Sequence, residues 1–356
     1  MKSSIALLAI GTTLALLHPA QAQNPDPMDI RACTAIESDA QRLACYDQAT
    51  GRNQLPAAVK QAPPAEHPNV FAGGDNRRNP RHTVNQPMSL LDSRWELAPE
   101  TKLGTFNVRG YKPVYVMPLY ATDSPNTTPH SANPDNDVSV PEPLKKVEMK
   151  FQLSFKTKVA QGLFGDNGDL WVAYTQSSRW QTYNAGQSRP FRETNYEPEA
   201  MLAFNTRYSV LGWEGRLLGI GLNHQSNGRG DPWSRSWNRL IANIGFERGD
   251  WVLMLRPWWR IGESRRHDDN PDITDYMGRG ELQLVREWNG HEFSLTARHA
   301  FNRGTDRGAT RFTWSFPVAG NLRGYMELFN GYGESLIDYN HHANHIGLGV
   351  SLLDWY

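Results

Sequence analysis

Residues 291–318 read HEFSLTARHAFNRGTDRGATRFTWSFPV. Apolar side chains occupy alternate positions in both halves of this stretch, at Phe293, Leu295, Ala297, Phe312, Trp314 and Phe316. Because successive side chains of a β-strand point to opposite faces, this alternation predicts two strands, each with one apolar face and one polar face.

Segments of the same kind follow one another from about Gly104 to the last residue. We count about twelve, near residues 104–121, 146–160, 168–182, 200–211, 214–226, 236–248, 250–263, 272–288, 291–303, 308–318, 322–332 and 345–356. Each is near the length that a tilted strand needs to cross a bilayer, and an even number is expected of an outer-membrane barrel. We expect the last segment to face lipid with its even-numbered residues, from Ile346 to Tyr356.

The connections between these segments alternate in length. The long ones lie near residues 122–145, 183–199, 227–235, 264–271, 302–308 and 333–344. Long outer loops alternating with short periplasmic turns are typical of a transmembrane antiparallel β-barrel. A secreted β-sandwich could show similar alternation, but it has no reason to keep this parity of loops. The sequence therefore predicts an all-β barrel of about twelve strands, with loop 227–235 on the cell-surface side.

The N-terminus has the layout of a secretory signal peptide. Lys2 precedes an apolar run from Ile5 to Leu17, so we expect residues 1–22 to be removed and the mature protein to lie outside the cytoplasm. No later stretch approaches the roughly 18 consecutive apolar residues of a transmembrane helix. The mean hydropathy of −0.61 is that of a polar chain. A net charge of zero gives no sign of a nucleic-acid partner.

Residues 23–88 are expected to form a periplasmic extension that is partly disordered. One short helix-like piece is followed by a stretch rich in Pro, Gln, Asn and Arg that is too poor in apolar residues to form a core. Cys33 and Cys45 both lie in this extension, where an oxidising compartment favours a disulfide. The alternative is two unpaired small side chains. The barrel domain is expected to occupy residues 89–356.

Three polar side chains interrupt the apolar faces of two consecutive predicted strands. The apolar face of one strand ends in His224 and Ser226, and that of the next begins with Asn238. If the hairpin closes symmetrically about Asp231, Asn238 lies opposite His224. A nucleophile, a base and an acceptor that orients the base are the three roles of a serine-hydrolase triad.

Asparagine can replace the acid of such a triad, because its carbonyl still accepts the imidazole N–H and fixes the tautomer. A site that faces lipid favours this choice, since an unpaired carboxylate beside hydrocarbon is costly. The alternative is that the three residues are ordinary polar side chains at the rim of a barrel. Three of them at matching register favour a functional site.

The motifs around these residues resemble those of the outer membrane phospholipase A family. They are NHQSNGR at 223–229, DP at 231–232, SRSWNR at 234–239, PFRETNYEP at 190–198, NPDIT at 270–274 and GYGESLIDYN at 331–340. The resemblance covers about residue 90 to the C-terminus. It implies a calcium-dependent hydrolase in a twelve-stranded outer-membrane barrel, activated as a homodimer. Its expected reaction is cleavage of sn-1 and sn-2 ester bonds of phospholipids and lysophospholipids in the outer leaflet.

The same resemblance assigns the site residues. The family's triad matches His224, Ser226 and Asn238, and its oxyanion hole matches the Gly228 N–H with calcium-bound water.

The calcium ligands of the family match the Arg229 carbonyl, the Ser234 hydroxyl and, from the other chain, the partner subunit's Ser188 carbonyl. Asp231 matches a residue of a second, monomer-type calcium site. Neutral oxygen ligands of this kind suit a weakly bound cation that stabilises an oxyanion.

Outside the triad, several residues leave alternatives open. Gln176 matches a glutamine of the family's dimer interface, and the alternative is an interfacial polar side chain near the membrane surface. His341, His342 and His345 suggest a metal site, but we expect a solvated surface loop because no carboxylate or cysteine stands at ligand spacing. The insert at 121–143 has no counterpart in the resemblance, and neither has the 23–88 extension.

Two other functions compete with the lipid hydrolase. A non-enzymatic barrel, such as a narrow channel or an adhesin, would carry the His-Ser-Asn set without using it. A secreted soluble esterase would use the set but would not be extracted from a membrane.

Overall fold

A computed structural model describes residues 30–50, 89–264, 267–301 and 306–356. The predicted signal peptide and most of the extension lie outside the described residues. The described part of the N-terminal unit holds the 3-10 helix η1 (Ile30–Ala35) and the helix α1 (Asp39–Ala49). Cys33 and Cys45 form a disulfide there, which confirms the predicted pairing.

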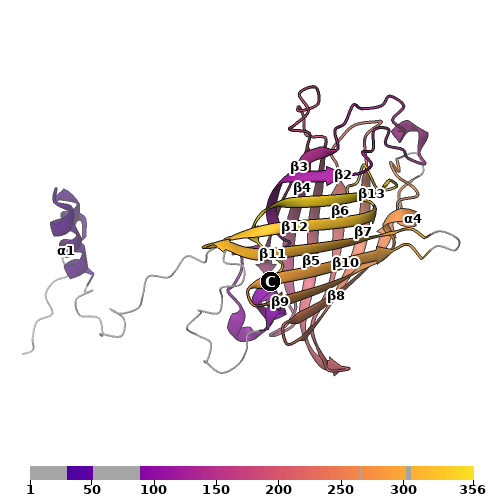
Figure 1. Cartoon of the computed structure of the whole chain (residues 1–356). Helices are drawn as coiled ribbons and strands as arrows, with labels where there is room; N and C mark the ends of the chain where they lie inside the picture. The colour runs from indigo at the N-terminus through magenta and orange to yellow at the C-terminus, as the bar shows by residue number, and fades with distance from the viewer. Residues whose placement is uncertain (1–29, 51–88, 265–266, 302–305) are drawn as a thin grey trace, which may run out of the picture. The chain divides into compact units, whose positions relative to one another are not determined.

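The second unit is a closed antiparallel β-barrel (Figure 1). Its strands are β1 (Val108–Gly110), β2 (Val114–Thr122), β3 (Val147–Ala160), β4 (Asp169–Trp180), β5 (Glu193–Val210), β6 (Trp213–Ser226), β7 (Ser236–Arg248), β8 (Trp251–Ile261), β9 (Gly280–Trp288), β10 (His291–His299), β11 (Gly308–Ala319), β12 (Leu322–Tyr332) and β13 (His342–Leu353). Each strand from β2 to β13 pairs with the next, and β13 pairs with β2, so the sheet has no open edge. Strand β1 pairs with β3 in line with β2, so the barrel has the twelve strand positions that the sequence predicted.

Two predicted strand boundaries were wrong. Strand β5 begins at Glu193 rather than near residue 200, because its polar first residues face the lumen, where Glu193 is fully buried. Strand β9 begins at Gly280 rather than near residue 272. The intervening residues form the one-turn helix α4 (Thr274–Met277), which ends at Gly278 with a φ of +77°.

The end of the chain also differs from the prediction. Ile346, Leu348, Val350 and Leu352 are exposed on the outer face, as expected. Tyr356, however, is only 8% exposed and packs inside the barrel, because β13 ends at Leu353 and the last residues turn into the lumen. Glu292 of β10 accepts hydrogen bonds from the backbone N–H groups of Trp355 and Tyr356 at 3.1 and 3.0 Å.

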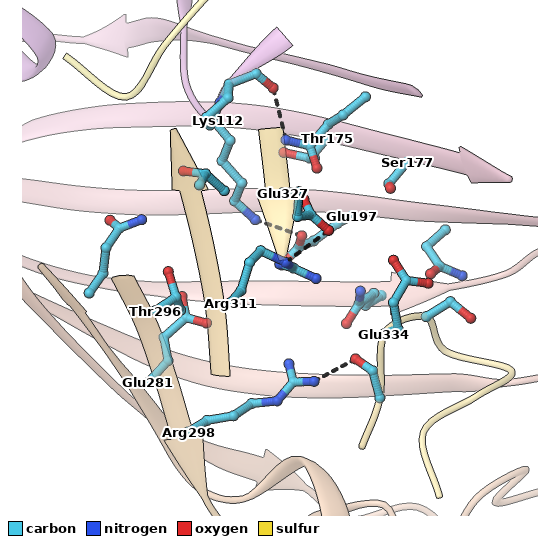
Figure 2. A pocket seen from close by; sticks show the side chains of 18 of the residues that line it. Lys112, Thr175, Ser177, Glu197, Glu281, Thr296, Arg298, Arg311, Glu327 and Glu334 are labelled. Carbon is cyan, nitrogen blue, oxygen red and sulfur yellow. Dashed lines mark hydrogen bonds and ion pairs between the residues drawn. The ribbon is translucent and has the colours of Figure 1, made fainter. Parts of the chain in front are cut away.

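Charged side chains fill the middle of the lumen (Figure 2). Lys150 of β3 contacts Glu327 at 2.7 Å and Glu334 at 2.6 Å, and Arg179 contacts Glu334 at 2.8 Å. All four are buried, and the space left between the lining side chains is about 160 Å³. The polar face of the alternating pattern is therefore the inner one, held together by ion pairs.

The segment that precedes β1 seals the end of the barrel that carries the short turns. It includes helix α3 (Leu90–Trp95), whose N-cap Ser89 accepts a hydrogen bond from the Asp92 N–H. Leu91 is fully buried in a hydrophobic core with Leu217 and other residues of the inner wall. Glu247 of β7 accepts hydrogen bonds from the Leu91 N–H and the Ser89 hydroxyl, so the segment is fixed by polar and apolar contacts.

Two further 3-10 helices complete the barrel unit. The helix η4 (Pro99–Thr101) follows α3, and η5 (Pro134–Asn136) lies in the long loop between β2 and β3. Among the described residues, no helix has both the length and the apolar character to cross a membrane.

The inner packing of Leu91 leads to a stability prediction. Leu91→Ala should lower the free energy of unfolding by about 2–5 kcal/mol, because it removes buried methyl groups and leaves a cavity. Guanidinium titration of the barrel in phospholipid vesicles, followed by tryptophan fluorescence, measures this change.

Leu211→Ala is the matched control, since Leu211 is 91% exposed in a turn. It should change the stability by less than about 0.5 kcal/mol. Equal losses in the two variants would show that the α3 segment adds nothing to the core.

Candidate active site

The hairpin of β6 and β7 brings the three candidate triad residues together. The register pairs His224 with Asn238 and Ser226 with Ser236, as the symmetric closure predicted. Leu218, Ile220 and Leu222 precede His224 on the outer face of β6 and are 44%, 48% and 57% exposed. The candidate site therefore lies on the outside of the barrel, at the end that carries the long loops.

His224 and Asn238 form a direct hydrogen bond. His224 Nδ1 lies 2.8 Å from Asn238 Oδ1. Because a carbonyl oxygen only accepts, the proton is on Nδ1, and Nε2 is left free to accept a proton from a nucleophile. This is the orientation that general-base catalysis needs.

Ser226 lies on the same face of β6, two residues beyond His224. Alternate residues of a strand are separated by about 6.6 Å. Between these two described residues, no hydrogen bond joins the serine hydroxyl to the imidazole. In unliganded hydrolases such bonds are often long and tighten only when substrate binds. The structure thus brings His224 and Asn238, the candidate base and orienting residue, into contact, with the candidate nucleophile Ser226 beside them.

The loop after Ser226 is held from within by Asn227, which is buried. The Asn227 Oδ1 accepts hydrogen bonds from the N–H groups of Arg229 and Arg235, and its Nδ2 donates to the Trp233 carbonyl at 2.7 Å. Gly228 has a φ of +64°, and an added Cβ would lie 3.0 Å from the Tyr196 ring. No acceptor in the described part of the chain takes its N–H. That N–H is free to serve a substrate oxygen.

The residues proposed to hold calcium lie on two loops, with Arg229, Asp231 and Ser234 between β6 and β7 and Ser188 between β4 and β5. Ser234 donates its hydroxyl proton to Asp269 Oδ2 at 2.7 Å, and the Ser188 carbonyl accepts from Trp180 Nε1 at 2.8 Å. Arg229 donates to the Arg192 carbonyl at 3.0 Å. Among the described residues, no group of three or more His, Cys, Asp or Glu side chains is arranged to bind a metal.

Arg192, at the end of the loop between β4 and β5, joins this loop to β3 and to loop 333–341 through buried ion pairs. It contacts Glu148 at 2.8 Å and Asp338 at 3.2 Å. Burial by itself would raise the pKa of Asp338, but the charge of Arg192 and the hydrogen bond from Ser335 outweigh it, so this pKa lies below its ordinary value. Asp338 therefore stays ionised and keeps loop 333–341 attached to the segment that precedes β5.

The insert at 121–143 contributes to the site, which the sequence did not reveal. Asn136 is 1% exposed and donates to Asp231 Oδ1 at 2.8 Å and to the Ser234 carbonyl at 3.4 Å. Arg235, fully buried, donates to the carbonyls of Asn136 and His130. The insert thus supports the loop that follows the candidate nucleophile.

Glu263 and Asp269 were also not identified from the sequence. Glu263 accepts a hydrogen bond from Asn238 Nδ2 at 2.9 Å. Asp269 accepts from the hydroxyls of both Ser234 and Ser236. Glu263 is the last residue of the strand predicted at 250–263. Its position in that alternating pattern is the only sequence signal that could have identified it.

The remaining predicted residues have these positions. Gln176 is half-buried on the outer side of β4, where it accepts from the Tyr174 hydroxyl at 3.1 Å. The predicted histidine loop was wrong in part, because β13 already begins at His342. His345 points inward and stacks on Tyr120 at a centroid distance of 5.0 Å.

Comparisons with known proteins identify the family of this barrel. A family model described as Phospholipase A1 matches residues 91–352. The chain belongs to the phospholipase A1 family. It is an outer-membrane β-barrel phospholipase, a carboxylic ester hydrolase.

Two solved structures are similar to this phospholipase. Outer membrane phospholipase A from Escherichia coli is 39% identical, with a TM-score of 0.63 over 70% of this chain and 95% of that one. A Salmonella typhi outer membrane phospholipase, crystallised as a dimer with bound calcium, is 39% identical, with a TM-score of 0.63 over 70% of this chain and 94% of that one.

A Neisseria meningitidis protein, named provisionally as a phospholipase A1, is 37% identical over 351 residues. That alignment covers 90% of this phospholipase and 90% of the relative. The barrel region, residues 89–356, is a smaller part of the chain than this alignment covers. Part of the 23–88 extension therefore has a counterpart in this relative, contrary to the expectation from the motifs.

The contacts of Asn136 predict how the insert acts on the loop. Asn136→Ala should speed tryptic cleavage after Arg229 and Arg235 by roughly tenfold. Losing a buried hydrogen bond costs about 1–3 kcal/mol, and proteolysis follows the population of the open loop. Limited digestion followed by mass spectrometry measures the rate.

Asp135→Ala is the control for this experiment. Asp135 is the exposed neighbour of Asn136 in the same insert, so its loss should leave both cleavage rates unchanged. If the two variants were cleaved equally fast, the insert would not be what holds the loop.

Proposed function

We propose that this phospholipase hydrolyses the sn-1 and sn-2 ester bonds of phospholipids, and those of lysophospholipids, with Ser226 as nucleophile, His224 as base and Asn238 as the residue that orients the base. The observation that carries the proposal is the 2.8 Å hydrogen bond between His224 Nδ1 and Asn238 Oδ1, beside Ser226 on the outer face. A site on that face meets lipid directly, so a substrate reaches it by lateral diffusion in the outer leaflet.

Each step of the proposed reaction has a group of this chain to perform it. Ser226 Oγ attacks the ester carbonyl carbon while its proton passes to His224 Nε2. The oxyanion of the tetrahedral intermediate accepts a hydrogen bond from the Gly228 N–H. When the intermediate collapses, the bond to the glycerol oxygen breaks and the imidazolium gives its proton to that oxygen. Water, deprotonated by His224, then hydrolyses the acyl-serine and releases the fatty acid.

We infer that the active enzyme holds Ca²⁺ beside the nucleophile. The ligands would be the Arg229 carbonyl, the Ser234 hydroxyl and the partner subunit's Ser188 carbonyl. These are oxygen donors, which Ca²⁺ prefers, and Ser234 Oγ lies 2.7 Å from the carboxylate of Asp269. When bound, the cation would supply electrostatic stabilisation of the oxyanion through polarised water. Asp231 is proposed to serve a second site, used in the monomer.

A homodimer is the proposed active state, because one subunit offers only part of this ligand set. The Salmonella typhi relative, crystallised as a dimer with bound calcium, supports this proposal. Gln176 is the proposed polar contact of the interface. We further assign residues 1–22 to a signal peptide, 23–88 to a periplasmic extension and 89–356 to the catalytic barrel, whose site faces the cell surface.

Substitution of the triad tests the chemistry. Ser226→Ala and His224→Ala should each abolish nearly all hydrolysis of a phospholipid in mixed micelles, and combining them should add little, because nucleophile and base act as a unit. Asn238→Ala should retain more activity, since it removes only the orientation of the base. Substantial turnover by Ser226→Ala would move the nucleophile elsewhere, with Ser234 and Ser236 as the next candidates.

Calcium and dimerisation should be linked in both directions. Because the proposed site is completed by the partner, calcium should tighten the dimer by the same factor by which dimerisation tightens calcium binding. Chelation should therefore lower both the activity and the dimer fraction in detergent, measured by turnover and sedimentation.

Ser234→Asn should weaken calcium binding and activity together, while the same change at the exposed Ser139 should affect neither. A chelated, monomeric sample with full activity would refute the shared site and leave the triad standing.

A further inference from the structure

The amide of Asn238 is held from both sides. Its oxygen accepts from His224 Nδ1 at 2.8 Å, and its nitrogen donates to Glu263 Oε1 at 2.9 Å. An unrestrained asparagine amide could rotate by half a turn and present its NH₂ group to the imidazole. With a carboxylate on the other side, that rotation would place two acceptor oxygens against each other. Glu263 therefore fixes the orientation in which Asn238 accepts.

Glu263 reaches this position through the register of the sheet. Asn238 of β7 pairs with Ile261 of β8. Trp259 and Ile261 are 57% and 45% exposed on the outer face, and Glu263 lies two residues beyond Ile261, the last residue of β8. Diagonal neighbours of this kind are within reach of a long side chain across adjacent strands.

In the described part of the chain, no Lys, Arg or His forms an ion pair with Glu263, and the Asn238 amide is its one hydrogen-bond donor. A carboxylate at the edge of an apolar outer face is costly to maintain, so its presence calls for a role.

We propose that Glu263 is a positioning residue that extends the triad to a chain of four, Ser226, His224, Asn238 and Glu263. This proposal rests on the proposed triad. The carboxylate orients the Asn238 amide and polarises it, which makes Oδ1 a better acceptor for the imidazolium that forms during catalysis. In this way the negative charge of Glu263 stabilises the protonated base through Asn238, whereas in a Ser-His-Asp triad the carboxylate contacts the histidine directly.

The same arrangement explains why residue 238 is asparagine in this chain. An aspartate there would face the carboxylate of Glu263 at hydrogen-bonding distance, and two like charges would repel each other. An amide instead donates to one neighbour and accepts from the other. Glu263 and Asn238 are therefore expected to act as a matched pair.

Kinetics of single variants give the first test, with purified dimeric enzyme, calcium and a phospholipid in mixed micelles. Glu263→Ala should lower kcat about tenfold, the scale of one charge-assisted hydrogen bond, with KM unchanged. Glu263→Gln should lower kcat less, because its carbonyl still accepts from Asn238. Glu214→Gln, an exposed glutamate at the other end of β6, is the control and should match the unmodified enzyme.

A double-mutant cycle separates positioning from a structural role. In an Asn238→Ala background, Glu263→Ala should have no further effect on kcat, because the residue through which it acts is gone. The same tenfold loss in that background, or no loss in the unmodified one, overturns the proposal.

Reversal of the pair gives the second test. Asn238→Asp alone should lower kcat, and Asn238→Asp combined with Glu263→Gln should restore most of it, since the glutamine amide can donate to the new carboxylate. A double variant no better than Asn238→Asp overturns the proposed pairing.

Labelling of Ser226 by a fluorophosphonate probe, followed in each variant, distinguishes failure of the triad from failure of the Glu263 proposal. An enzyme that is active but unlabelled at Ser226 disproves the triad itself. Normal labelling in Glu263→Ala disproves only the role of Glu263.

Discussion

A strand that crosses hydrocarbon has to satisfy every backbone N–H and C=O within the protein, and the pairing of β13 with β2 meets this requirement. Without that last ladder, two strands would present unpaired edges to the lipid. Once the sheet is closed, alternate side chains must point outward to lipid or inward to the lumen. The apolar outer face, the ion pairs of the lumen and the outward position of the proposed active site all follow from this single closure.

The residues proposed as catalytic lie on the outward-facing side of β6, at the point where this strand leaves the apolar zone. The side chains at positions 218, 220 and 222 of β6 are apolar and exposed on the outer face. The next two positions of the same face are His224 and Ser226. Strand β7 supplies Asn238 by register, and Glu263 follows two residues after the end of β8. Rigid neighbouring strands hold the base and its supports, while the loop after Ser226 is supported by Asn227, Arg229 and the insert.

Much of this arrangement could be predicted from the sequence, because it depends on periods of two. The alternation of side chains predicted the twelve strand positions and the pairing of His224 with Asn238, and the alternation of loop lengths predicted which loops lie on the same side. Parity could not say where a strand stops being apolar. Strand β5 begins with Glu193, which points into the lumen, and the residues after Pro271 fold into α4. The predicted starts of β5 and β9 were therefore misplaced. Contacts between loops, such as Asn136 with Asp231, depend on chain paths that no local pattern encodes.

The filled lumen has a consequence for the cell that makes this protein. Lys150, Arg179, Glu327 and Glu334 cross the interior as a connected set of ion pairs, and the α3 segment and Tyr356 pack below them. A barrel of this width with an empty interior would be a pore. Because side chains occupy this interior, little open space remains for solutes, which suits an enzyme that works on the lipid of a permeability barrier and resides in that barrier.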